Sequence, residues 1–113
     1  MGMTGEGCPL DTLNKVREAM KKQVVFSIHA HRQMDMRGIT VGEVFEALEA
    51  AELVEDYPDD PRGHSCLLLG RTRSGRSLHI ICAPSDEGLI VITVYEPSLI
   101  EWEPDFKTRR RCP

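Results

Sequence analysis

The sequence predicts a single α+β domain in which N-terminal helices pack on one face of a four-stranded antiparallel meander sheet. Apolar residues recur at helical spacings before residue 51 and at strand-like spacings after it. Short loops rich in Gly, Pro, Ser and Asp separate the strand-like runs, which favours antiparallel neighbours. The 113 residues suit one such domain, over residues 1–113, with its helices grouped on one side of the sheet.

The N-terminal region is predicted to contain an amphipathic helix over residues 9–22. Its apolar residues are spaced by three and four: Leu10, Leu13, Val16 and Met20. Lys21 and Lys22 lie in the last turn, where cations are favourable beside the negative end of the helix dipole. Residues 1–8 are small and polar, and we expect them to be disordered.

Two further helices are predicted around a tight corner. Ser27 can cap a helix that follows a short edge strand over residues 24–27. Gly38 stands where a residue in the left-handed conformation would end that helix. Thr40 and Glu43 have the spacing of a capping box, which starts the next helix.

The second half of the chain is predicted to form four strands, over residues 52–57, 64–73, 76–83 and 89–96. The middle two flank the Ser-Gly dipeptide at 74–75 and are typical of a hairpin. A two-residue turn there places residues whose numbers sum to 149 opposite each other, so that Gly70 faces His79. In this register Cys66 and Cys82 lie on opposite faces, and no disulfide is expected between them.

The C-terminal residues are predicted to return to the sheet. Leu99, Trp102 and Phe106 offer apolar side chains that can pack on it, and a basic tail follows them.

Charge is distributed unevenly along the chain. The net charge of −4, taken as an average, argues against a protein that binds nucleic acid. Residues 1–60 carry six basic and twelve acidic side chains, whereas residues 61–113 carry eight and six. Residues 61–85 include four arginines and no acidic residue, so a folded sheet can present a basic face.

Several classes of protein are disfavoured. No apolar run approaches the roughly 20 residues needed to cross a bilayer, and the N-terminus lacks the order of a signal peptide, so we expect a cytoplasmic protein without a membrane partner. The four cysteines form no CxxC pair and share no ligand spacing with the histidines, so we expect neither a metal site nor a cofactor. A helix-turn-helix is disfavoured because its second helix would carry Glu43, Glu46 and Glu49 toward phosphates.

Several blocks of the sequence together resemble one bacterial family. The blocks are, in order, HAxxQMxxRGIT, EVxEAL, EDYPDDPRGxSCLLLGRTRSGRxLHxxCA, ITVYEP and WxxDFKTRR. They resemble the bacterial domain of unknown function 4258 family, which is grouped with the RelE/ParE-like toxins. The resemblance covers residues 26–110 and leaves residues 9–22 as an extra N-terminal helix.

The resemblance implies a RelE-like fold, with two helices on a four-stranded antiparallel sheet. It also implies a toxin-like component of a bacterial toxin–antitoxin system, encoded beside a small antitoxin protein of the zinc-finger type. Many members of the wider superfamily cleave mRNA, commonly on the ribosome, so RNA or the ribosome is an implied partner. One position departs from some relatives, because Gln33 stands where they carry an arginine and Arg32 lies one place earlier on a different helix face.

Residues 26–110, the part of the chain that resembles this family, contain side chains suited to metal-independent RNA cleavage. The reaction needs a base for the 2′-hydroxyl, cations for the phosphate and an acid for the leaving oxygen. Four residues are candidates for catalysis: His29, His79, Arg71 and Tyr95. Five more are candidates for contacts with nucleic acid: Arg73, Arg76, Lys107, Arg109 and Arg110. We therefore hypothesise an RNA-binding endoribonuclease of the mRNA interferase kind.

Each candidate also has a structural interpretation. His29 lies in the first turn of its helix, where the dipole favours a neutral imidazole, but a histidine there can equally pack at a corner. His79 can be a hydrogen-bonded strand histidine, and Tyr95 can serve packing alone. The hairpin arginines can be solvated. The alternative hypothesis is a RelE-fold module that binds a partner protein without catalysis.

Overall fold

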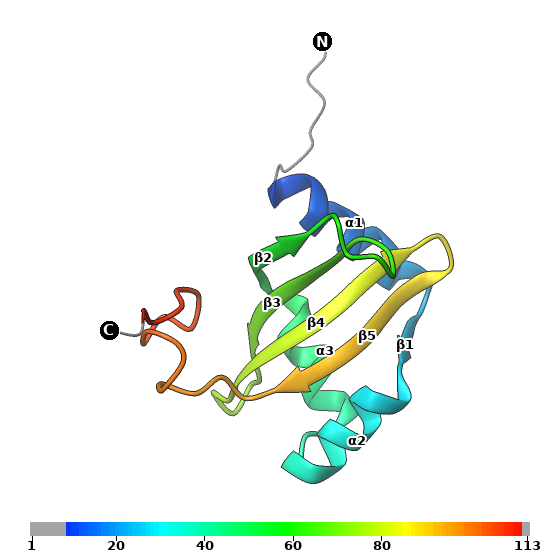
Figure 1. Cartoon of the computed structure of the whole chain (residues 1–113). Coiled ribbons are helices and arrows are strands. Elements are labelled where there is room, and N and C mark those ends of the chain that lie inside the picture. The colour runs from blue at the N-terminus through cyan, green and yellow to red at the C-terminus, as the bar shows by residue number, and fades with distance from the viewer. Residues whose placement is uncertain (1–8, 112–113) are drawn as a thin grey trace.

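The computed structural model describes residues 9–111 (Figure 1). The prediction of disorder for residues 1–8 lies outside the described residues. In chain order the described part contains α1 (Pro9–Lys22), β1 (Val24–Phe26), α2 (Ile28–Arg37), α3 (Val41–Glu49), β2 (Glu52–Tyr57), β3 (Ser65–Arg71), β4 (Ser77–Ser85) and β5 (Gly88–Tyr95). The predicted α+β class and the positions of the predicted helices are confirmed.

The corner between α2 and α3 forms as the capping residues predict. The Ser27 hydroxyl accepts a hydrogen bond from the Ala30 amide, and Gly38 ends α2 in the left-handed conformation with φ of 65°. Thr40 and Glu43 form both hydrogen bonds of a capping box at the start of α3. The start and end of each helix at this corner are therefore set by local hydrogen bonds.

The sheet differs from the predicted four-stranded antiparallel meander. Within residues 9–111 it has five strands in the order β1-β5-β4-β3-β2, and β1 runs parallel to β5. The short run Val24–Phe26 follows α1 directly and adds to the edge of β5, where unpaired backbone groups would otherwise face solvent. The antiparallel pairing of β2 to β5 and the short edge strand are therefore confirmed, whereas the total of four strands is wrong: β1 joins the sheet as a fifth strand, and its parallel pairing makes the sheet mixed.

All three described helices pack on the same side of this sheet, and Figure 1 shows α1 and α3 behind it. We call this side the helix face. Its core contains buried apolar residues from every helix, together with buried strand residues such as Leu68, Leu78, Ile80 and Val91. Burial of these side chains supplies the main hydrophobic stabilisation of the domain.

The hairpin of β3 and β4 is one residue out of the predicted register. Gly70 pairs with Leu78, and Leu69 pairs with His79. The Thr72 amide donates to the Arg76 carbonyl, so the loop consists of the three residues 73–75 instead of two. Gly75, with φ of 90°, completes this longer loop as a left-handed residue. With a loop of three residues, the numbers of paired residues sum to 148 and not to the predicted 149.

This shift corrects two predictions about faces. Gly70 lies on the helix face and not beside His79, and a Cβ there would lie 2.0 Å from the carbonyl oxygen of Ala47. Cys66 and Cys82 are direct partners on the helix face, with 3.9 Å between their sulfur atoms. Both are buried free thiols.

The other side of the sheet, which we call the outer face, carries Leu67, Leu69, Arg71 and His79. The C-terminal segment, residues 96–111, lies against part of it and is the orange-to-red trace beside the sheet in Figure 1. Trp102 is buried there as predicted, but Leu99 is 54% exposed and does not pack on the sheet. No helix in residues 9–111 has the length and apolar character required to cross a membrane.

Candidate functional site

A histidine and a tyrosine form the centre of the candidate site on the outer face. His79 on β4 and Tyr95 on β5 are direct cross-strand partners. His79 Nε2 lies 2.7 Å from the carbonyl oxygen of Phe106, and His79 Nδ1 lies 3.1 Å from the Tyr95 hydroxyl. Because a carbonyl oxygen only accepts, we assign the hydrogen to Nε2, and Nδ1 then accepts a hydrogen bond from Tyr95.

The C-terminal segment covers this pair. The Trp102 ring packs edge-on against the imidazole, with 4.6 Å between ring centroids, and both side chains are buried. Phe106, whose carbonyl holds His79, has φ of 57°, which is uncommon for a residue with a side chain. Asp105 supports this conformation by accepting hydrogen bonds from the amides of Lys107 and Thr108. The strained backbone is therefore located where the cover meets the histidine.

An ion pair links the same segment to β2. The Arg109 guanidinium donates two hydrogen bonds to the Glu55 carboxylate, at 2.7 and 3.0 Å, and lies 4.7 Å from the centre of the Trp102 ring. The Tyr57 hydroxyl donates to the same carboxylate. Glu55 is thus the acceptor that joins β2 to the cover.

Burial and hydrogen bonding shift the pKa values of these groups in different directions. Burial lowers the pKa of His79 and raises the pKa of Tyr95, so the imidazole is neutral and the phenol protonated near neutral pH. The Arg109 hydrogen bonds lower the pKa of Glu55, and burial with the Glu55 contact raises the pKa of Tyr57 to about 12. A neutral base and a protonated acid lie side by side, which is the arrangement that acid–base chemistry requires.

The two arginines of the hairpin loop are paired with acidic side chains. Arg76 lies 2.8 Å from Glu96 and 3.2 Å from Glu43, and it also donates to the carbonyls of Arg37 and Gly38. Arg76 therefore caps the last carbonyl groups of α2 and holds this end of the helix against the β3–β4 hairpin. No acidic residue stands beside Arg76 in the sequence, because its partners are 20 and 33 residues away.

Arg73 has comparable partners on α3. Its guanidinium lies 4.0 Å from Glu46 and 3.8 Å from Glu49, and its amide donates to Glu46. Arg71 differs: it is exposed on the outer face at the end of β3 and forms no ion pair with any residue in the described range 9–111. Of the predicted hairpin contacts, Arg71 alone presents a guanidinium without an acidic partner in that range.

The basic residues of the C-terminal segment also lie beside carboxylates. Lys107 lies 3.4 Å from Glu52, and Arg110 lies 3.4 Å from Glu103. Exposed ion pairs of this kind contribute little to stability and exchange readily for other anions.

His29 lies apart from the other candidates for catalysis. It is exposed in the first turn of α2, which packs on the helix face through Ala30 and Met34. His79 and Tyr95 lie on the opposite side of the sheet, together with Arg71. The structure thus brings three of the four predicted catalytic residues to one face and leaves His29 on the other side.

Glu55 and Tyr57 belong to this site but are absent from the sequence-based prediction. They lie two residues apart on β2, so the strand period places them on one face, and this spacing could have predicted that they act together. The signal is obscured by an irregularity in the pairing of β2 between Leu53 and Glu55. Among residues 9–111, no group of three or more His, Cys, Asp or Glu side chains is arranged to hold a metal ion.

Comparison with protein families gives one match. The model described as "Domain of unknown function (DUF4258)" matches residues 26–96. The chain belongs to the DUF4258 family. The search of curated proteins and the search of solved structures found no match.

The DUF4258 match divides the candidate site. It extends from the last residue of β1 to just beyond β5, so His79, Tyr95, Glu55 and Arg71 lie inside it. Helix α1 and most of the C-terminal segment, including Trp102, lie outside it. The histidine–tyrosine pair is therefore part of the DUF4258 domain, whereas its cover is an addition to the matched region.

Proposed function

We propose that this DUF4258 protein is a toxin-like component of a bacterial toxin–antitoxin system with a RelE-like fold, and that it binds and cleaves RNA on the outer face. The observation that carries the proposal is the contact between His79 Nδ1 and the Tyr95 hydroxyl, at 3.1 Å across the paired strands β4 and β5. An imidazole beside a hydroxyl on neighbouring strands is an arrangement that acid–base sites use. RNA is proposed as the substrate because the sequence resembles the RelE/ParE-like toxins. The same resemblance implies a bacterial source.

The chemistry assigned to the pair follows from its residue types and from its position on neighbouring strands. A neutral His79 imidazole takes the proton of a 2′-hydroxyl at Nδ1 once Tyr95 turns its own hydroxyl from Nδ1 to the substrate. The 2′-oxygen then bonds to the adjacent phosphorus while the bond to the 5′-oxygen breaks. Tyr95 gives its proton to that leaving oxygen. Arg71 and Arg109 supply the positive charge that the phosphate needs.

Access to the pair requires the C-terminal segment to move away from the outer face. His79 is completely buried beneath Trp102, so RNA cannot reach it while the segment is in place. The polar contacts of the segment are mostly exposed ion pairs, such as Lys107 with Glu52, which phosphates can replace at low cost. Released Lys107, Arg109 and Arg110 would then be available to RNA, together with the hairpin residues Arg73 and Arg76 if their acidic partners are displaced.

The test is cleavage of mRNA by the purified protein, with and without ribosomes. Tyr95→Phe keeps the ring and removes the hydroxyl, and it should slow cleavage by about 10²–10⁴-fold. His79→Gln is the second variant, and His31→Ala, an exposed histidine on α2, is the matched control. Cleavage should leave a 2′,3′-cyclic phosphate and should persist in the presence of EDTA.

Two outcomes would contradict the catalytic proposal. The absence of cleavage in both settings, together with no growth inhibition on expression, would exclude a toxic nuclease. Unchanged cleavage by both the Tyr95 and His79 variants would remove these residues from the mechanism.

A second candidate function is a RelE-fold module that binds a small antitoxin-like protein without catalysis. The ion pairs of Arg73 and Arg76 with acidic residues favour it, because these arginines already have anionic partners. Growth inhibition that survives both Tyr95→Phe and His79→Gln would support this function over the nuclease.

A further inference from the structure

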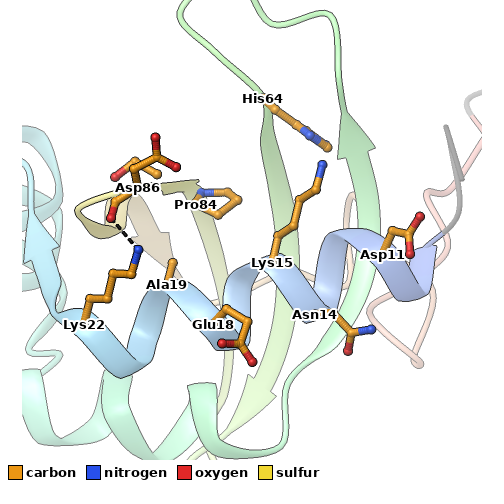
Figure 2. A pocket seen from close by; sticks show the side chains of 10 residues that line it. Asp11, Asn14, Lys15, Glu18, Ala19, Lys22, His64, Pro84 and Asp86 are labelled. Atoms are coloured by element: carbon orange, nitrogen blue, oxygen red, sulfur yellow. Dashed lines mark hydrogen bonds between the residues drawn. The ribbon is translucent and has the colours of Figure 1, made fainter.

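A cavity of about 620 Å³ lies on a different part of the molecule, between α1 and the loops at one end of the sheet (Figure 2). Its walls come from α1, from His64 in the β2–β3 loop and from Pro84–Asp86 beside the β4–β5 turn. The volume is that of a site for a small molecule. Because α1 lies outside the DUF4258 match, this cavity depends on a part of the chain that the match does not include.

One wall is held by a chain of three polar side chains. The hydroxyl of Thr12, which is 2% exposed, donates to Asp56 Oδ2 at 2.9 Å. Asp56 Oδ1 lies 2.5 Å from His64 Nε2. Because Nε2–H donates to the carboxylate, the remaining ring nitrogen Nδ1 can accept a hydrogen bond from another molecule, and it has no hydrogen bond within residues 9–111. A surface loop histidine is thereby fixed in one orientation at the cavity.

Lys15 extends from α1 toward this histidine, as Figure 2 shows. Asp11 and Glu18 stand four residues before and three residues after it, where helical ion pairs form. Glu18 instead pairs with Lys21 at 3.0 Å, and Lys15 forms no ion pair in the described part of the chain. An ammonium group without a partner in that part of the chain therefore lies beside a positioned imidazole.

The far end of the cavity combines an engaged cation with an exposed carboxylate. Lys22 donates to the backbone carbonyl of Asp86 at 2.7 Å, which brings the β4–β5 turn to α1 (Figure 2). The Asp86 carboxylate is exposed there and can accept hydrogen bonds. Between the two ends, Ala19 and Pro84 provide small apolar surfaces. The cavity thus has one end with the ammonium group of Lys15, an apolar middle, and another end where Lys22 is bound to the Asp86 carbonyl and the Asp86 carboxylate can accept.

We propose that this cavity binds a small phosphate monoester of mononucleotide size. The phosphate accepts hydrogen bonds from Lys15, because ammonium groups form strong charge-assisted hydrogen bonds with phosphate oxygens, and a ligand hydroxyl donates to the free Nδ1 of His64. The flat faces of the ligand's rings lie over Ala19 and Pro84, and hydroxyl or amino groups of the ligand donate to Asp86. The nearby carboxylates of Asp11 and Glu18 disfavour a bare anion, so the ligand needs both ends of the cavity.

Calorimetric or NMR titration of the full chain with AMP, adenosine and inorganic phosphate tests the proposal. AMP should bind at least about tenfold more tightly than adenosine or phosphate alone, because only AMP uses both ends. Lys15→Ala should weaken AMP binding about tenfold or more, and His64→Ala should also weaken it. Arg17→Ala is the matched control: it removes the same charge from the same helix, lies outside the cavity and forms no ion pair within the described residues, so it should leave AMP binding unchanged.

The remaining outcomes overturn the proposal. AMP that does not bind at millimolar concentration, or binds equally to the Lys15→Ala protein, excludes this site. An equal loss of AMP binding in Lys15→Ala and Arg17→Ala shows a general charge effect. The Tyr95→Phe protein separates the two proposed sites: loss of AMP binding there, with Lys15→Ala unaffected, would place the ligand on the outer face.

Discussion

The two faces of the sheet use the same strands for different purposes. On the helix face, β3 and β4 present Leu68, Leu78 and Ile80, each of which is completely buried among apolar neighbours. On the outer face, the alternate residues include His79, which is covered by Trp102 and held by hydrogen bonds. One face therefore depends on close apolar packing, whereas the other depends on a few polar contacts and one aromatic ring. We expect the first to tolerate change poorly and the second to open locally.

The largest effect is expected from Gly70→Ala on the helix face. An added Cβ would meet the carbonyl oxygen of Ala47 at 2.0 Å and its Cβ at 2.8 Å. Neither atom can move without shifting α3 away from β3, so the free energy of unfolding should fall by more than about 3 kcal/mol. Denaturant titration followed by circular dichroism measures this loss.

Gly42→Ala on α3 is the matched control for this substitution. A Cβ at Gly42 meets only the Thr40 hydroxyl, at 3.8 Å, and alanine favours a helix over glycine. Its free energy of unfolding should remain within about 1 kcal/mol of the parent or rise. Equal stabilities for the two variants would mean that β3 and α3 are not closely packed.

A smaller effect is expected from Trp102→Ala on the outer face. The tryptophan is 1% exposed, and large-to-small changes of this size commonly cost about 3–5 kcal/mol in a core. Here the loss should be limited to about 2 kcal/mol, because the C-terminal segment can detach while the helix face stays intact. Hydrogen exchange should accelerate at amides of the segment, such as Glu103 and Arg110, and not in β3.

Leu99→Ala serves as the control within the same segment. Leu99 is more than half exposed, so its truncation should change the free energy of unfolding by less than about 0.5 kcal/mol. If Trp102→Ala instead accelerates exchange across the whole sheet, the two faces form one cooperative unit and the comparison fails.

The fold was largely predictable because its signals are local. Apolar spacing located the helices, and Ser27, Gly38, Thr40 and Glu43 fixed the corner through contacts within a few residues. The errors arose where long-range pairing decides the result. Nothing local to Val24–Phe26 reveals that it joins β5 in parallel, and the Ser-Gly signal in the hairpin fits a two-residue loop as well as the three-residue loop that forms.

The candidate site was less predictable than the fold. His79 and Tyr95 were both candidates, but only the pairing of β4 with β5 places them together. The acidic partners of Arg73 and Arg76 are far away in sequence, so a segment without acidic residues becomes, in the fold, a network of ion pairs. The cover over His79 depends on the backbone carbonyl of Phe106. Every residue type has such a carbonyl, so the amino-acid sequence could not predict this contact.

The smallest expected effect concerns the ion pair between Arg109 and Glu55. Arg109 lowers the folded-state pKa of Glu55, so the pair stabilises the fold fully above the unfolded value of about 4.5. That contribution is lost as the pH falls through the lower folded-state pKa. Arg109→Ala should therefore reduce the free energy of unfolding by up to about 1 kcal/mol at pH 7, since Arg109 is largely exposed, and the difference should shrink toward pH 2.

Thermal denaturation at pH 7 and at pH 2–3 measures this difference, with Arg111→Ala as the control. Arg111 belongs to the same segment, carries the same charge, is exposed and forms no ion pair within the described residues, so its substitution should have little effect at either pH. A loss of several kcal/mol for Arg109→Ala at pH 7 would mean that this pair locks the segment to β2. Phosphates could not then displace Arg109 cheaply, and the proposed access of RNA to His79 would be excluded on energetic grounds.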